Sequence, residues 1–232
     1  MAPVPSLGKS LYTPGRHGLE GAAAIQYNTW IHRLVRILVR PLAGTPVTPN
    51  HLTTLRLITG IAAALGYGVG EAPWVVWASA VFVVSVLLDR GDGELARLTG
   101  QTSEAGHRYD IKVDAICNTA ILIGVGVGLR HSALGMWAIP MGVVGGLSVA
   151  AIAALVIRFE RDKGARSFHV QGVAGFDPDD AILIIPLAMV LGAGVPLLVA
   201  ATVAAPIAAL VFFFEVRRRR RAAEDEADGT GG

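Results

Sequence analysis

Charged residues are scarce in this sequence: they make up 16% of its 232 residues, whereas apolar residues make up 53%. Soluble domains carry about 25% charged residues, so this chain has too few to cover a surface that faces water. It contains a single cysteine, Cys117, which excludes a disulfide within the chain and leaves the redox compartment open. Together with a mean hydropathy of +0.53, these shortages favour an integral membrane protein.

Six apolar segments are candidates for membrane-spanning helices, each of which needs about 20 residues. They cover residues 51–70, 73–97, 107–130, 133–157, 179–193 and 196–215. The fifth segment is short, although the sequence DPDD, which begins at Asp177, can extend it into the membrane interface. Residues 1–20 hold no apolar run of the kind that marks a cleavable signal.

Residues 22–42 differ from these segments because arginines recur among their apolar residues. Arg33, Arg36 and Arg40 fall on one side of a helix, which is typical of a helix lying in the headgroup layer. An amphipathic helix packed on protein has the same pattern. The apolar positions at helical spacing are Ile25, Trp30, Ile31, Leu34, Ile37 and Leu38. We therefore expect an all-α integral membrane protein with six transmembrane helices and an N-terminal interfacial amphipathic helix.

Basic residues predict how this protein is oriented, because cytoplasmic loops carry an excess of Lys and Arg. One side of the membrane receives the arginines of residues 33–40, 97–108, 158–166 and 217–221, whereas the other receives only Arg130 with His131. Both termini and the loop between the second and third spans are therefore expected in the cytoplasm. The expected regions are a flexible tail over residues 1–21, a membrane domain over 22–220 and a disordered acidic tail over 221–232.

Four aspartates stand where apolar spans end or begin, and their spacing places them on two helical stripes. Asp89 and Asp92 share one stripe with Gly93 and Ala96, with Arg97 at its border, at 100° per residue. Gly106, Asp110 and Asp114 form the second stripe. Two antiparallel helices joined by a short loop can turn these stripes toward each other, so that the carboxylates converge at the cytoplasmic surface.

Converging carboxylates must be neutralised, either because some stay protonated or because a divalent cation binds them. A site built from carboxylates alone suits Mg²⁺, Mn²⁺ or Ca²⁺ and disfavours zinc. Mg²⁺ held in this way usually also binds substrate phosphate, which points to phosphoryl chemistry. The glycines beside the aspartates suggest that a ligand such as a nucleobase approaches the helix backbone closely, and Arg97 can bind a phosphate.

The string Asp89-x2-Asp92-Gly93-x2-Ala96-Arg97-x8-Gly106-x3-Asp110-x3-Asp114 resembles the signature of the CDP-alcohol phosphotransferase family, also called CDP-alcohol phosphatidyltransferases. It agrees with that signature at every defining position. The sequence TPNHLT at residues 48–53 is similar to the start of the first span in many members. The resemblance covers roughly residues 22–220.

The resemblance implies transfer of a substituted phosphate from a CDP-linked donor to an alcohol hydroxyl, with release of CMP. It implies that Asp114 is the general base and that one or two Mg²⁺ or Mn²⁺ ions are bound. It also implies a homodimer, and no nucleic-acid partner is expected. The implied metal ligands are Asp89, Asp92, Asp110 and Asp114. The implied residues around the nucleotide are Asn50, Thr53, Asp89, Gly93, Ala96, Arg97 and Gly106.

We expect a phospholipid synthase of the bacterial inner membrane, which moves a phosphatidyl group from CDP-diacylglycerol to a polar alcohol. A member that uses CDP-inositol or CDP-choline as donor is the alternative within the family. An aspartate-rich membrane prenyltransferase or a cation transporter is the alternative outside it, although neither a second aspartate-rich motif nor an internal repeat is seen. A basic group can bind the acceptor phosphate or an anionic headgroup, but orientation bias explains it equally well. Its members are Arg158, Arg161, Lys163 and Arg166.

Overall fold

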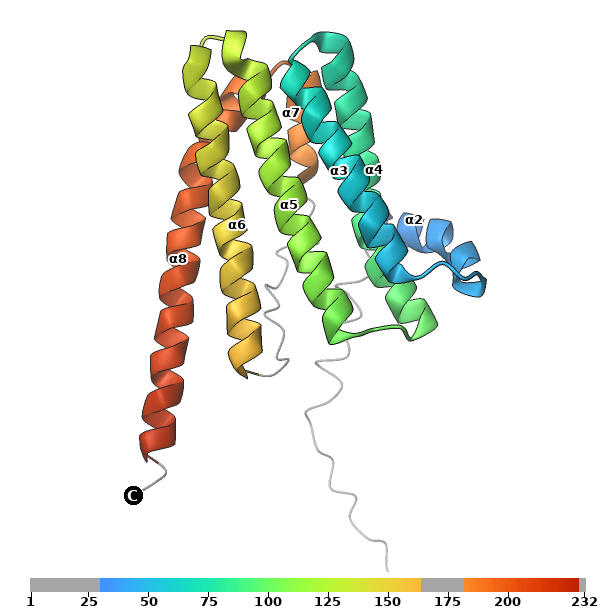
Figure 1. The fold of residues 1–232 in the computed structure, drawn as a ribbon, viewed down its shortest axis with the longest axis vertical. Coiled ribbons are helices and arrows are strands. Elements are labelled where there is room, and N and C mark those ends of the chain that lie inside the picture. Colours follow the sequence, from blue (N-terminus) through green and yellow to red (C-terminus); the bar gives the residue numbers. More distant parts are fainter. Residues whose placement is uncertain (1–29, 164–181, 230–232) are drawn as a thin grey trace, which may run out of the picture.

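The computed structural model describes residues 30–163 and 182–229, and all its regular elements in these ranges are helices. The long helices stand side by side in the order α8, α6, α5, α3 and α4, with the short α7 behind them and α2 against α4 (Figure 1). The long helices are α3 (Pro49–Val69), α4 (Ala72–Thr99), α5 (Glu104–Gly128), α6 (Ala138–Lys163) and α8 (Gly194–Gly229); the short ones are α2 (Trp30–Val39) and α7 (Ile184–Val190).

Five helices among the described residues are long and apolar enough to cross a membrane. They correspond to five of the six expected spans, and the expected class, an all-α membrane protein, is confirmed. The remaining segment, 179–193, contains α7, which is 7 residues long. Residues 164–181, which include the expected helix start at Asp177, lie outside the described residues.

Local capping fixes where the helices around the site begin and end. At the start of α3, the Nδ1 atom of His51 accepts a hydrogen bond from the backbone N–H of Thr48 at 3.2 Å. Helix α4 ends at Gly100, whose φ of +67° lies in the left-handed region that glycine adopts without steric cost. The Oγ of Ser103 then caps α5 by accepting from the N–H of Gly106 at 3.0 Å. A link of four residues, Gly100 to Ser103, therefore holds the end of α4 beside the start of α5.

Glycines let α5 approach α3 closely. A Cβ on Gly124 would collide with the carbonyl of Ala64, and one on Gly128 would collide with that of Tyr67. Small residues four positions apart are the usual means by which membrane helices pack backbone to backbone. This contact, with the buried core around Tyr67 and Phe82, aligns the polar ends of α3, α4 and α5.

The ends of the described chain bear on two expectations. Helix α2 packs Val35 and Val39 against the core beside Leu95, whereas Leu34, Ile37 and Leu38 on another face are exposed. One face of α2 thus contacts protein, and an exposed apolar face remains, as an interfacial helix requires. The tail over residues 221–232 was expected to be disordered, but α8 continues as a helix to Gly229. Its Ala and Glu residues are good helix formers, which explains this difference.

Candidate active site

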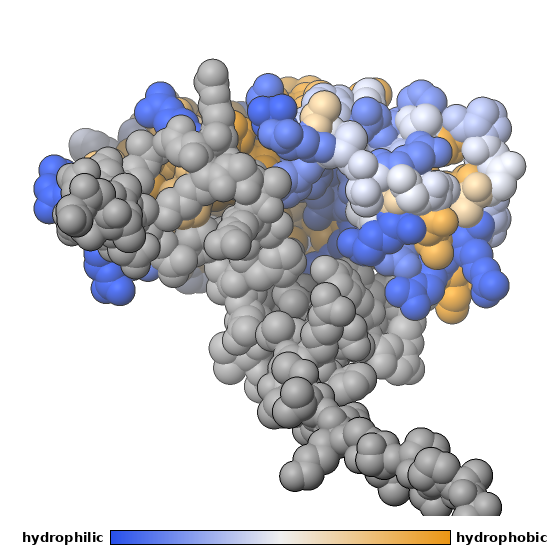
Figure 2. Space-filling view, turned by 90° about the horizontal axis from the view of Figure 1, so that it is seen from below, coloured by the Kyte–Doolittle hydropathy of each residue, from blue (hydrophilic) through white to orange (hydrophobic). Residues whose placement is uncertain are grey.

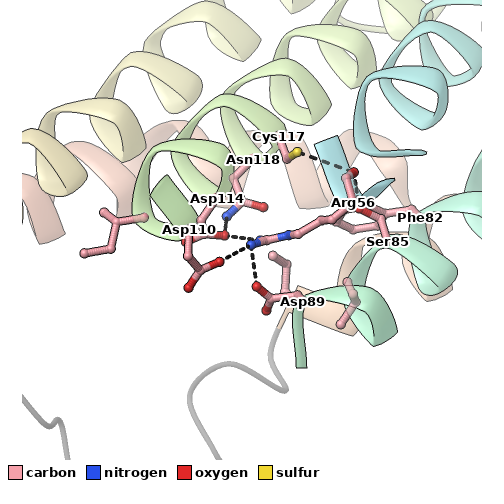
Figure 3. Close-up of a pocket in the computed structure, with 11 residues that line it drawn as sticks. Arg56, Phe82, Ser85, Asp89, Asp110, Asp114, Cys117 and Asn118 are labelled. Atoms are coloured by element: carbon pink, nitrogen blue, oxygen red, sulfur yellow. Dashed lines mark hydrogen bonds and ion pairs between the residues drawn. The ribbon is translucent and has the colours of Figure 1, made fainter. Parts of the chain in front are cut away.

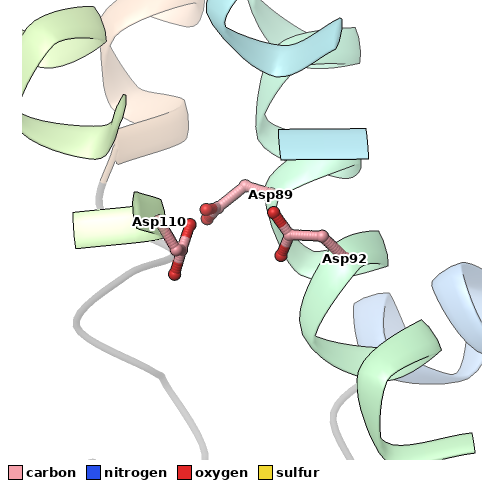
Figure 4. Close-up of side chains that lie close together, drawn as sticks. All are labelled: Asp89, Asp92 and Asp110. Carbon is pink, nitrogen blue, oxygen red and sulfur yellow. The ribbon is translucent and has the colours of Figure 1, made fainter. Parts of the chain in front are cut away.

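Three carboxylates from two helices meet at the end of the bundle where α4 ends and α5 begins. Asp89 and Asp92 come from α4 and Asp110 from α5, and one oxygen of each lies within 4.8 Å of the others (Figure 4). Figure 2 views this end of the molecule, where hydrophilic residues gather. The two predicted stripes therefore meet at this end of the bundle, although α4 and α5 each pack mainly against α3 and not against each other (Figure 1).

A buried arginine, Arg56 of α3, lies among these carboxylates (Figure 3). It pairs with two of them, Asp89 and Asp110, and with a fourth aspartate, Asp114. Its guanidinium donates to Asp110 at 3.3 Å and to Asp114 at 2.5 Å, and it forms an ion pair with Asp89. Arg56 is only 4% exposed. Because a buried cation is stable only when it is paired, this arginine and the aspartates compensate each other.

Asp114 lies one turn after Asp110 on α5 but outside the group of three close carboxylates. Its Oδ1 accepts from Arg56 and also from the Nδ2 of Asn118 at 2.7 Å. Its Oδ2 has no hydrogen-bond partner among the described residues. Half of the Asp114 side chain is exposed. The residue is thus held at one oxygen and open to a ligand at the other.

Asp92 is the buried member of the group, and Thr53 of α3 holds it. The hydroxyl of Thr53 donates to the Oδ2 of Asp92 at 2.5 Å, and both side chains are buried. Thr53 was expected to contact the nucleotide. It lines the pocket described next, together with other expected nucleotide residues, but its hydroxyl donates to Asp92.

A pocket of about 190 Å³ opens on one side of the aspartates. The side chain of Arg97 borders it beside Gly93, where an added Cβ would meet nothing closer than the Nη1 of Arg97 at 3.6 Å. The expected nucleotide residues in its lining are Asn50, Thr53, Gly93, Ala96, Arg97 and Gly106, together with Asp92 and Asp110. Asp89, the remaining expected nucleotide residue, lines a second pocket instead.

The second pocket, of about 280 Å³, lies on the other side of the aspartates and shares Asp110 with the first (Figure 3). Asp114 and Asn118 border it together with Arg56. The Oδ1 of Asn118 is buried and has no hydrogen-bond partner among the described residues. The carboxylate group therefore stands where two pockets meet.

The expected acceptor residues are only partly described. Arg158 is exposed near the end of α6. Arg161 and Lys163 belong to the last turn of α6, but their side chains lie outside the described part, as does all of Arg166. Their role in acceptor binding stays a prediction.

Sequence reasoning missed Arg56, Asn118 and a buried acid, Glu94. The signal for Arg56 was present, since it is a lone cation in the apolar run of the first span, and intramembrane ionisable residues are functional by default. Glu94 and Asn118 gave weaker signals. Glu94 occupies an unspecified position of the pattern, directly after Gly93, and Asn118 lies one turn beyond its last aspartate, Asp114.

The side chains of the site fit a hard divalent cation. Each of Asp89, Asp92 and Asp110 offers a carboxylate oxygen within 4.8 Å of the others, and oxygen ligands of this kind are preferred by Mg²⁺ and Mn²⁺. The group of three contains no His or Cys ligand that would favour zinc. Both pockets reach this group through Asp110, so a bound ion is accessible to ligands in either.

Comparison with known proteins identifies relatives of this chain. The sequence model of the CDP-alcohol phosphatidyltransferase family matches residues 46–216, which include all four aspartates of the site. The chain is also similar to the archaetidylinositol phosphate synthase of Pyrococcus horikoshii, with 30% identity over 89 residues. That match covers 38% of this chain and 46% of the relative, so the chain spans about half the length of the relative that it matches.

Proposed function

The chain belongs to the CDP-alcohol phosphatidyltransferase family, and we propose that it transfers a phosphatidyl group from CDP-diacylglycerol to a hydroxyl of a polar alcohol, releasing CMP. The observation that carries this proposal is the group of three carboxylates at the junction of two pockets. Transfer between two substrates requires both to reach one phosphorus atom, and this junction gives each substrate its own approach. Neither the prenyltransferase nor the transporter alternative agrees with membership of this family.

The smaller pocket is the proposed site for the cytidine diphosphate part of the donor. The helix backbone is accessible in its lining at Gly93, and the guanidinium of Arg97 lies beside it. Arginine binds phosphate oxygens through a planar fork of donors. Asn50 at the start of α3 supplies an amide at the same rim. The pyrophosphate would then extend from Arg97 toward Asp92 and Asp110.

Asp89, Asp92 and Asp110 are the proposed ligands of one or two Mg²⁺ or Mn²⁺ ions, with Asp114 close by. A divalent ion bound there neutralises the charge that develops on the phosphate oxygens during transfer. Thr53 fixes the orientation of the Asp92 carboxylate through its hydroxyl. Arg56 keeps the remaining aspartates gathered by pairing with them.

Asp114 is the proposed general base. The acceptor hydroxyl oxygen forms a bond to the phosphorus that carries the diacylglycerol, and the bond from that phosphorus to the CMP oxygen breaks. The hydroxyl proton passes to Asp114, and the bond electrons leave with CMP. Arg56 and Asn118 both bind Oδ1, which orients the carboxylate and leaves Oδ2 to take the proton.

The larger pocket is the proposed site of the acceptor alcohol, because Asp114 and Asn118 both line it. The name of the relative from P. horikoshii indicates a product with an inositol phosphate headgroup. We therefore propose inositol phosphate as the first acceptor to test. The phosphate of such an acceptor could also pair with basic residues at the end of α6, where Arg158 stands.

A donor such as CDP-inositol or CDP-choline is the second candidate within the family. The smaller pocket does not distinguish such a donor from CDP-diacylglycerol, since both carry the same cytidine diphosphate. We retain CDP-diacylglycerol first because many apolar side chains on the long helices are exposed, so a lipid donor can reach the site from the bilayer. We further propose a homodimer in the bacterial inner membrane, with the site and both termini in the cytoplasm, in agreement with the distribution of basic residues.

The test is reconstitution of the purified protein in nanodiscs with CDP-diacylglycerol and a panel of acceptors that includes inositol phosphate. CMP release and a new lipid on thin-layer chromatography are expected with Mg²⁺ or Mn²⁺, and neither with EDTA. A variant with Asp110→Asn serves as the inactive control. CMP release only from CDP-inositol or CDP-choline would select the second candidate. No CMP release from any of these donors, with either metal, would refute the proposal.

A further inference from the structure

Glu94 is an acidic side chain buried in α4, directly after Gly93. It is only 2% exposed, and a carboxylate in such a place is stable only when cations compensate it. Two arginines do so from opposite directions. Its Oε1 accepts from the Nε of Arg36 at 2.6 Å, and its Oε2 accepts from the Nη2 of Arg97 at 2.9 Å.

The pairing with Arg97 fixes a guanidinium at the rim of the smaller pocket. Glu94 accepts from Nε at 3.3 Å and from Nη2, both on one edge of the guanidinium. Nη1 and Nη2 lie 3.6 Å and 3.9 Å from the position of a Cβ on Gly93, which lines the same pocket. The Arg97 side chain is 42% exposed, and an arginine that is not held loses considerable rotamer freedom when it binds an anion.

The pairing with Arg36 connects this guanidinium to a different element. Helix α2 packs Val35 and Val39 on the face of α4 that bears Leu95. A Cβ on Gly91 would already contact Val39 at 3.2 Å, so α2 lies directly on the stretch of α4 that carries Asp92 and Glu94. Arg36 extends from this contact to Glu94 and is itself 55% exposed.

We propose that Glu94 is a positioning residue that holds Arg97 for the donor phosphates, and that Arg36 makes this position depend on the docking of α2. The inference rests on the proposed nucleotide site. A guanidinium held at the rim of the smaller pocket complements an anionic donor. Because α2 also exposes Leu34, Ile37 and Leu38, the element that holds Glu94 has the exposed apolar face that an interfacial helix requires.

The sign of the change in CDP affinity separates this proposal from simple electrostatics. Glu94→Gln keeps the shape of the side chain but removes its charge. Loss of a negative charge near the pocket would by itself strengthen the binding of an anion. Loss of the restraint on Arg97 weakens it. We expect weaker binding, with CDP affinity lower by about tenfold, because a direct contact at Arg97 outweighs a more distant charge.

The experiment measures CDP binding by calorimetry and KM and kcat for the donor, both in nanodiscs. Glu94→Gln should lower CDP affinity and raise KM while kcat changes little. In an Arg97→Gln background, Glu94→Gln should have no further effect on CDP affinity, because the interaction through which it acts is gone. A general structural role would lower affinity in both backgrounds. Unchanged or tighter CDP binding by Glu94→Gln, or equal losses in both backgrounds, would overturn the inference.

Variants of α2 keep the test decisive if Glu94→Gln does not fold. Arg36→Gln should lower CDP affinity by several-fold, Arg36→Lys should restore part of it, and Arg40→Gln, directly after α2, should leave it unchanged. Arg40 is a matched control because it is exposed and does not pair with Glu94. Equal affinities of Arg36→Gln and wild type would also overturn the inference. Failure of the wild-type protein to bind CDP would instead refute the proposed nucleotide site.

Discussion

Arg56 donates to Oδ1 of Asp114 at 2.5 Å while it also pairs with Asp89 and Asp110. A single buried cation from α3 thus holds carboxylates from both α4 and α5. In this arrangement the aspartates have two different roles. Asp89 and Asp110 belong to the group that fits a metal ion, whereas Asp114 lies beside that group and presents its second oxygen to the larger pocket.

Asp114→Asn should abolish turnover and leave the protein folded. The amide can still occupy the space between Arg56 and Asn118, but it cannot accept a proton, so kcat should fall by about 10²–10⁴-fold. CDP affinity should remain near that of wild type, because Asp114 does not line the smaller pocket. Single-turnover CMP release and CDP calorimetry measure the two quantities. Wild-type kcat in this variant would remove the assignment of the base.

Arg56→Gln should destabilise the protein in a way that divalent metal corrects. Removal of one partner of a buried ion pair costs about 3–5 kcal/mol, and the cost here should be at the lower end because the aspartates keep contact with solvent. Since the remaining carboxylates repel each other, Mg²⁺ should raise the Tm of this variant more than that of wild type.

The control for this prediction is Arg130→Gln. Arg130 also forms internal hydrogen bonds, to the carbonyls of Gly68 and Val127, but it stands at the other end of α5, away from the aspartates. Its variant should lose stability that Mg²⁺ does not restore. Equal increases of Tm with Mg²⁺ in Arg56→Gln, Arg130→Gln and wild type would contradict the role of Arg56.

The acidic half of the site was predictable from sequence because its geometry is local. Asp89 and Asp92 are three residues apart, and Asp110 and Asp114 are four apart, so each pair shares a helical face by covalent geometry alone. A short link then keeps the two helix ends near each other, and both helices pack against α3. No such rule relates Arg56 to its partners, because its place among them depends on how α3 packs against α5 at Gly124 and Gly128.

The membrane helices were predictable for a similar reason, and the chain end was not. Length and apolar composition identify a span without reference to its neighbours, and five spans were located to within a few residues. The tail over residues 221–232 was judged by its charge, which is typical of disorder. Its Ala and Glu residues also favour helix, and a helix already formed by the preceding span continues through them to Gly229.

Thr53→Val should release the Asp92 carboxylate from the orientation in which the Thr53 hydroxyl holds it. The substitution keeps the size of the side chain but removes a hydrogen bond to a carboxylate, which is worth about 1.5–3 kcal/mol. We expect the Mg²⁺ concentration for half-maximal CMP release to rise by about tenfold or more. Thr54→Val is the matched control, because the hydroxyl of Thr54 bonds Asn50 and Tyr109 instead. A Mg²⁺ dependence identical in both variants would show that Thr53 does not orient Asp92.

Gly93→Ala should make the protein more stable and less able to bind the donor. A Cβ at this position meets only the end of the Arg97 side chain, at 3.6 Å, so it causes no collision, and alanine stabilises a helix by about 1 kcal/mol relative to glycine. The same methyl group projects into the smaller pocket, where it occupies space proposed for the nucleotide. Tm should therefore rise while CDP affinity falls by at least about tenfold.

Gly68→Ala provides the comparison that this prediction needs. Gly68 is also a helical glycine, in α3, and a Cβ there would have its nearest neighbours at 3.9 Å and 4.0 Å. It stands at the end of α3 opposite the site, so its variant should gain stability for the same reason and keep wild-type CDP affinity. If Gly93→Ala binds CDP as tightly as Gly68→Ala, then glycine at position 93 does not serve the donor. The nucleotide would then have to bind elsewhere than over this turn of α4.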